Sequence, residues 1–151
     1  MNPPDEAAAV EKLYEYGQRL AEPSGTKNES DYLGVISAAK GSSKSKQLAA
    51  QLIPRFFKHF PSLSSEGINA QLDLCEEDEL GIRVQAIRGL PLLCKDTPRH
   101  LPKIADVLGQ LLLAGKGQIH LLQDKLWGLV NLGRVALGCK VMRRHSEARR
   151  E

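Results

Sequence analysis

The sequence predicts an all-α fold, specifically a right-handed α-solenoid in which antiparallel helix pairs stack side by side. Three observations lead to this prediction. Apolar residues recur at helical spacing along most of the 151 residues. No segment alternates with the period of a strand between turn residues. The third expected helix is repeated in the fifth, as solenoid proteins repeat their helices.

Six helices are expected, and turn residues separate each from the next. Their ranges are 5–21, 28–40, from a serine cap at 42 or 43 to 59, 62–76, 79–95 and 98–113. The turn at 22–25 closes the first helix, and Gly41 is expected to end the second as a left-handed terminator. Pro61 ends the third helix. Asp78 can cap the fifth, and Pro98 fits the first turn of the sixth.

The third and fifth helices match when Pro54 is placed on Pro91, an offset of 37 residues. Lys46 then falls on Arg83, and Pro61 falls on Pro98. Repeats of about 40 residues with two helices are typical of HEAT and armadillo units, which bury their apolar faces by stacking. We expect the matched prolines to lie inside helices and kink them. The alternative is that each proline marks a helix end.

Composition and charge argue against several classes of protein, including nucleic-acid-binding, zinc-binding, secreted and membrane proteins. The net charge of +3 resides entirely in residues 140–151, and the balanced remainder argues against nucleic-acid binding by the main domain. The three cysteines are odd in number and form no CxxC pair, which disfavours a disulfide framework or a zinc site. The acidic N-terminus does not look like a signal peptide. The apolar stretch at 119–141 is interrupted by charges and glycines, so no membrane span is expected.

The usual catalytic and cofactor-binding motifs are incomplete. The segment 109–117 superficially resembles a P-loop, but five residues separate its glycines and no hydroxyl follows Lys116. The segment 43–46 matches an SxxK pattern without its companion motifs, and a serine before a helix is usually a cap. We therefore expect no enzymatic activity, no cofactor, no metal and no small-molecule substrate.

The third helix offers one candidate binding surface. Its polar side chains project to one side, and they are Lys44, Gln47, Gln51, Arg55 and Lys58. This stripe could contact an acidic partner or RNA phosphates. The favoured alternative is the solvated face of an amphipathic helix.

The sixth helix offers a second candidate, an LxxLL string formed by Leu108, Leu111 and Leu112. Such strings in short helices can dock into a groove on a partner. These leucines also share an apolar stripe with Leu101 and Ile104, which is the pattern of a helix that faces its own core. The core interpretation is favoured.

Four segments resemble the apoptosis inhibitor 5 family, also called anti-apoptosis clone 11. They are 48–61 (LAAQLIPRFFKHFP), 68–76 (INAQLDLCE), 82–87 (IRVQAI) and 101–108 (LPKIADVL). The chain looks like the N-terminal part of a plant member of this family, over roughly residues 8–114. The resemblance implies a HEAT- and armadillo-like scaffold in the nucleus that suppresses programmed cell death through protein contacts. It also places the family's LxxLL element on Leu108, Leu111 and Leu112.

After Ala114 the sequence departs from the family pattern. We expect a helical repeat domain at 1–114 and a divergent, glycine-punctuated helical tail at 115–151 that docks weakly and is disordered from Arg143. Because the family's C-terminal nuclear signal has no counterpart here, a cytoplasmic location is the alternative to the nucleus. The expected partners are other proteins, such as nuclear RNA helicases. The alternative function is an adaptor that binds RNA or RNA-helicase assemblies through the basic face of the third helix.

Overall fold

A computed structural model describes residues 3–23, 25–95, 98–113, 120 and 127–128. The described part of the chain contains six α-helices, as the sequence predicts. They are α1 (Pro3–Ala21), α2 (Glu29–Ser37), α3 (Ser43–Phe56), α4 (Ser64–Cys75), α5 (Leu80–Lys95) and α6 (Leu101–Leu113). The predicted tail and its boundary at residue 114 lie largely outside the described residues.

Short 3-10 segments continue or introduce several helices. They are η1 (Ala38–Lys40), η2 (Phe57–His59), η3 (Pro61–Leu63) and η4 (Pro98–His100). The second and third expected helices therefore end in a tighter turn, which is common at helix termini. Gly41 follows the first of these turns with an extended backbone, at a φ of −89°, so the expected left-handed terminator is wrong. Side chains cap α2 and α3, because Asn28 accepts a hydrogen bond from the Ser30 amide and Ser42 accepts one from the Ser45 amide.

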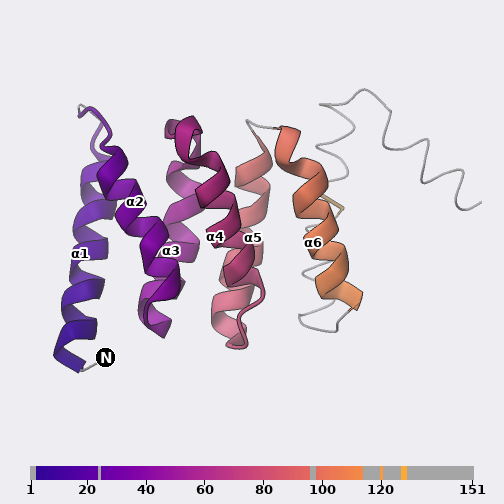
Figure 1. Ribbon diagram of the computed structural model, residues 1–151, viewed down its shortest axis with the longest axis horizontal. Helices are drawn as coiled ribbons and strands as arrows, with labels where there is room; N and C mark the ends of the chain where they lie inside the picture. Colours follow the sequence, from indigo (N-terminus) through magenta and orange to yellow (C-terminus); the bar gives the residue numbers. More distant parts are fainter. Residues whose placement is uncertain (1–2, 24, 96–97, 114–119, 121–126, 129–151) are drawn as a thin grey trace, which may run out of the picture.

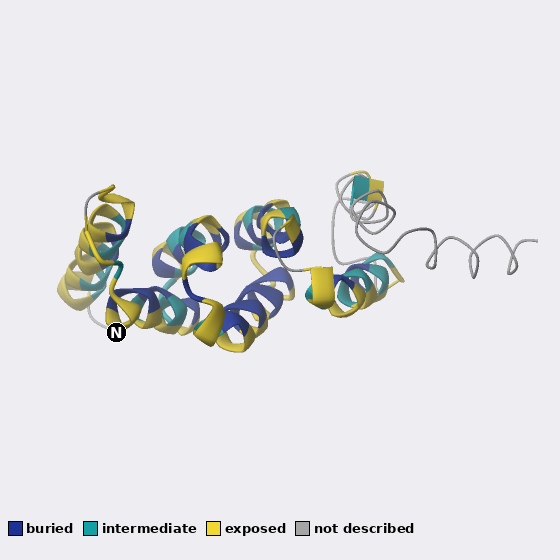
Figure 2. Cartoon of the chain, turned by 90° about the horizontal axis from the view of Figure 1, so that it is seen from above, coloured by how far each residue is buried: buried dark blue, intermediate teal, exposed yellow. Residues whose placement is uncertain are grey.

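The helices stack in two layers, with α1, α3 and α5 in one and α2, α4 and α6 in the other (Figure 1). Successive helices run antiparallel and are joined by short connections. Figure 2 shows the two rows from above, with the buried faces turned toward each other. This arrangement is consistent with an α-solenoid.

The core lies between the layers and is mainly aliphatic. Its largest fully buried side chains are Leu20, Tyr32, Ile53, Ile68, Leu74, Ile82, Ile87, Leu90, Leu93, Ile104 and Leu108. Each buried side chain of this size contributes about 1.5–3 kcal/mol relative to an exposed one. An aromatic pair adds to the core, because the rings of Tyr32 and Phe60 stack with centroids 4.6 Å apart.

Polar contacts between helices fix how the layers meet. The guanidinium of Arg19 in α1 donates two hydrogen bonds to the carboxylate of Asp31 in α2, at 2.9 and 2.7 Å. The hydroxyl of Tyr32 donates to the carbonyl of Ile53 in α3 at 2.9 Å. These bonds join consecutive helices across the layers.

Pro54 and Pro91 both lie inside their helices, α3 and α5. The alternative interpretation, that each proline marks a helix end, is therefore wrong. Pro54 also shapes the contact between α3 and α5: a Cβ atom added at Gly89 would lie 2.5 Å from the Pro54 ring. The two repeat-related helices thus approach closely at a glycine.

Candidate interaction surfaces

The polar stripe of α3 faces outward, as its amphipathic pattern indicates. Four of its five members are exposed: Lys44, Gln51, Arg55 and Lys58. The fifth, Gln47, is half-buried, and its amide nitrogen lies 3.3 Å from where a Cβ of Gly81 would be. Gln47 therefore belongs to the contact between α3 and α5.

The charges of α3, η2 and α5 are all positive. These segments contain no Asp or Glu, and their charged residues are Lys44, Lys46, Arg55, Lys58, Arg83, Arg88 and Lys95. The opposite layer differs, because α2 carries only Glu29 and Asp31 and α4 carries only Glu66 and Asp73. The two layers are therefore oppositely charged in the middle of the stack.

Two of the seven cations have structural partners in the turn between α4 and α5. The amine of Lys46 lies 2.7 Å from the carboxylate of Glu77. The guanidinium of Arg83 donates to the carbonyl oxygens of Glu77 and Asp78 at 2.6 and 3.2 Å. Lys46 and Arg83 occupy matching positions of the 37-residue repeat, so the repeat places both cations at the same turn.

The other five cations are exposed, and none has a carboxylate within 4.0 Å among the described residues. Two of these five cations, Arg88 and Lys95, lie on α5 and are not part of the stripe predicted from the sequence. The 37-residue repeat could have predicted both cations, because this offset places Lys95 on Lys58 and Arg88 on Gln51. Near the end of α3, partial burial lowers the pKa of His59, and the neighbouring charges of Lys27 and Lys58 lower it further.

The LxxLL string of α6 lies in the core. Leu108 and Leu111 are only 1% and 4% exposed, and Leu112 is partly buried against the same core. Leu101 and Ile104 are buried beside them. In this conformation the leucine side chains pack inside the protein, as the periodicity favours.

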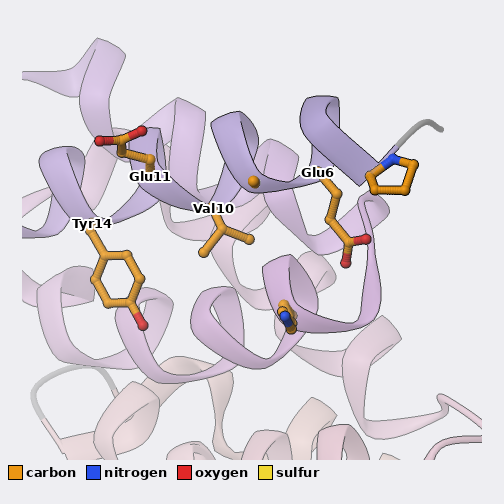
Figure 3. Close-up of a pocket in the computed structure, with 7 residues that line it drawn as sticks. Glu6, Val10, Glu11 and Tyr14 are labelled. Atoms are coloured by element: carbon orange, nitrogen blue, oxygen red, sulfur yellow. The ribbon is translucent and has the colours of Figure 1, made fainter.

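A shallow pocket of about 420 Å³ separates the first half of α1 from the start of α3. Figure 3 shows Glu6, Val10 and Tyr14 pointing from α1 toward α3. Lys44 lines the opposite side. Besides these side chains, the lining contains Pro3, Ala7 and Glu11, so its charged groups are two carboxylates and one amine.

A second groove, of about 580 Å³, lies between α2 and α4. Its charged lining mixes the carboxylates of Glu66, Asp73 and Glu77 with the amines of Lys40 and Lys46. Within the described residues, no three His, Cys, Asp or Glu side chains are grouped to hold a metal ion. No helix in that part of the chain has the length and apolar character needed to cross a membrane.

Comparison with known proteins gives a consistent match. The family described as apoptosis inhibitory protein 5 (API5) matches residues 10–120. The chain is 54% identical over 109 residues to the apoptosis inhibitor 5-like protein of rice, covering 71% of this chain and 20% of the relative. It is 47% identical over 105 residues to human apoptosis inhibitor 5, covering 68% and 20%. It is 43% identical over 106 residues to the fruit-fly homologue, covering 69% and 20%. The matched segment spans about a fifth of the length of these relatives.

Proposed function

The chain belongs to the apoptosis inhibitory protein 5 family, and from this premise we propose that it negatively regulates programmed cell death as a non-enzymatic protein-interaction scaffold. The names of its relatives support the anti-apoptotic role. The scaffold mechanism is supported by the stack of helices in two layers, which presents long helix faces of opposite charge to solvent. Stacked helical repeats generally use such extended faces to bind partners.

The same proposal includes a HEAT- or armadillo-like architecture. Helices α3 and α5 match at an offset of 37 residues and lie side by side in one layer. Their matching cations, Lys46 and Arg83, contact the same turn. Neighbouring units that bury equivalent faces against one another are what repeat proteins of this class require.

We propose the nucleus as the site of action and other proteins, including nuclear RNA helicases, as the partners. A pull-down from nuclear extract, comparing this chain with a full-length relative, tests the partners, and imaging of the fluorescently tagged chain in cells tests the location. Partners captured by the full-length protein and by this chain would support binding through the matched segment. Partners captured only by the full-length protein would contradict it.

A cell-death assay tests the function directly. Cultured rice cells depleted of their own apoptosis inhibitor 5-like protein would receive this chain, the full-length rice protein or an empty vector, followed by a death stimulus. We expect the chain to lower the fraction of dead cells relative to the empty vector. If only the full-length protein does so while this chain is expressed and folded, the proposed function of the chain is wrong.

A second candidate function is an adaptor that binds RNA through the basic face of α3. The exposure of Lys44, Arg55 and Lys58 favours it. Binding through phosphates would weaken steeply with salt, because cations on the protein displace counterions from RNA. An electrophoretic mobility titration at two salt concentrations, repeated with Arg55→Gln/Lys58→Gln, tests this candidate.

A further inference from the structure

We propose that α3 and α5 together form a docking surface for an acidic protein segment that also carries apolar side chains. We call this surface the α3–α5 basic face and define it by Arg55, Lys58, Arg88, Leu92 and Lys95. The inference rests on the proposed protein-binding function and names the chemistry of the partner.

The repeat places these side chains on one surface. Residues 88, 92 and 95 are spaced four and three positions apart along α5, so they share one side of that helix. Lys95 and Leu92 match Lys58 and Arg55 at the 37-residue offset. The two helices contact each other within one layer, as the close approach of Gly89 to Pro54 shows. Equivalent positions on adjacent, equivalent helices face the same way.

The charge of this surface is unbalanced. Arg55, Lys58, Arg88 and Lys95 are all exposed, and α3, η2 and α5 contain no acidic residue. Lys46 and Arg83 differ from these four cations, because both bond to the turn between α4 and α5. The four cations of the basic face have no such partner among the described residues. A partner with complementary negative charge would be attracted to this face and oriented by it.

The remaining features favour a protein segment over a nucleic acid. Leu92 is 51% exposed and lies between Arg88 and Lys95. An exposed aliphatic side chain within a charged rim suits the apolar centre of a protein interface. Proteins that bind single-stranded nucleic acid stack bases on exposed aromatic rings. The nearby rings of Phe56, Phe57 and Phe60 are instead 4%, 3% and 2% exposed.

Fluorescence anisotropy with three labelled probes tests the proposal. The probes are a peptide of about 20 residues that is mostly Asp and Glu with Leu at every fourth position, a poly-glutamate of equal length and a poly-uridine RNA of about 20 nucleotides. Arg88→Gln/Lys95→Gln is the test variant. Lys12→Gln/Lys40→Gln removes two exposed positive charges elsewhere and is the matched control. Circular dichroism and the melting temperature establish that both variants fold as the unchanged chain does.

We expect the leucine-containing acidic peptide to bind most tightly and to bind more weakly as salt rises. The test variant should lose about tenfold in affinity, since two exposed charge contacts are removed, whereas the control should change less than about twofold. Leu92→Ser should weaken the leucine-containing peptide but not poly-glutamate. Absence of peptide binding, or equal losses in the test and control variants, overturns the proposal. Tighter binding of the RNA with the same loss in the test variant also overturns it, in favour of the RNA candidate.

The cell-death assay separates this inference from the proposed function. If Arg88→Gln/Lys95→Gln fails to bind the peptide and also fails to lower cell death, both statements stand. If the variant still lowers cell death as well as the unchanged chain, the basic face is not the functional docking surface, and the inference is wrong while the proposed function stands.

Discussion

The side-chain amide of Gln71 donates a hydrogen bond of 3.1 Å to the backbone carbonyl of Ala50. This carbonyl lies four residues before Pro54, and proline has no N–H to complete the usual helical bond. The same Gln71 nitrogen donates to the carbonyl of Ala86 in α5 at 2.9 Å. Gln71 is fully buried in α4, so one side chain links three helices and satisfies an acceptor that the proline leaves free.

This relationship predicts an energetic coupling between Gln71 and Pro54. Gln71→Met keeps a similar volume but removes the donor, so it should lower the free energy of unfolding by about 1–3 kcal/mol. In a Pro54→Ala background the new backbone N–H can bond to the Ala50 carbonyl, and the cost of Gln71→Met should fall by about 1 kcal/mol. Urea unfolding of the four proteins measures the coupling. If Gln71→Met costs the same free energy of unfolding in both backgrounds, the Ala50 carbonyl does not couple Gln71 to Pro54.

Much of the fold could be predicted from the sequence, because helices with one apolar stripe and clear turn residues carry a strong local signal. The end of α5 at Lys95 and the burial of Leu108 are of this kind. The buried polar contacts could not be predicted. Gln71 and Asp31 look like ordinary surface residues, and their partners lie 12 to 21 positions away. Their roles depend on how helices meet, which periodicity within one helix does not report.

The candidate surface was predicted only in part for a similar reason. The amphipathic pattern of one helix indicates the stripe on α3 but not its continuation by Arg88 and Lys95 on α5. The 37-residue offset was already visible in the sequence. At this offset the polar positions of α3 also predict a continuation of the stripe on α5. The exposed Leu92 could not be predicted in this way, because its counterpart at the same offset is the basic Arg55, which does not indicate an exposed aliphatic side chain.

The close approach of α3 and α5 predicts opposite effects for two glycine substitutions. A Cβ atom at Gly89 would lie 2.5 Å from the Pro54 ring and 3.0 Å from the Gln71 amide nitrogen. Gly89→Ala should therefore destabilise the protein by about 1–3 kcal/mol, the usual cost of overpacking. Gly109 in α6 is the matched control, because a Cβ there meets nothing within 4 Å. Gly109→Ala should stabilise the protein by up to about 1 kcal/mol through helix propensity. Two stabilising substitutions would mean that α5 can shift away from Pro54 at little cost.

The ion pair between Arg19 and Asp31 predicts a specific dependence on pH. Hydrogen bonding from the guanidinium holds the pKa of Asp31 below its usual value. A carboxyl group with a lowered pKa stabilises the folded state above its unfolded pKa of about 3.9 and loses this contribution as the pH falls through the folded value. The melting temperature of Asp31→Asn should thus lie below that of the unchanged chain at neutral pH, and the gap should close in acid.

The exposed Asp73 provides a control for this measurement. Asp73→Asn should have nearly the same melting temperature as the unchanged chain at every pH. Because all other carboxyl groups are shared, the difference between the two variants isolates Asp31. A gap for Asp31→Asn that stays constant down to strongly acidic pH would show that packing, and not the charge, accounts for the loss.

The leucines of α6 allow the core and docking interpretations to be separated by stability. Leu111 is 4% exposed and Leu113 is 90% exposed, although both belong to the same helix. Leu111→Ala should lower the free energy of unfolding by about 2–5 kcal/mol, because it leaves a cavity in the core. Leu113→Ala should stay within about 0.5 kcal/mol, as expected for an exposed side chain. Chemical denaturation measures both values. If Leu111→Ala kept its stability but lost a protein partner in a pull-down, Leu111 would face a binding groove and its assignment to the core would be wrong.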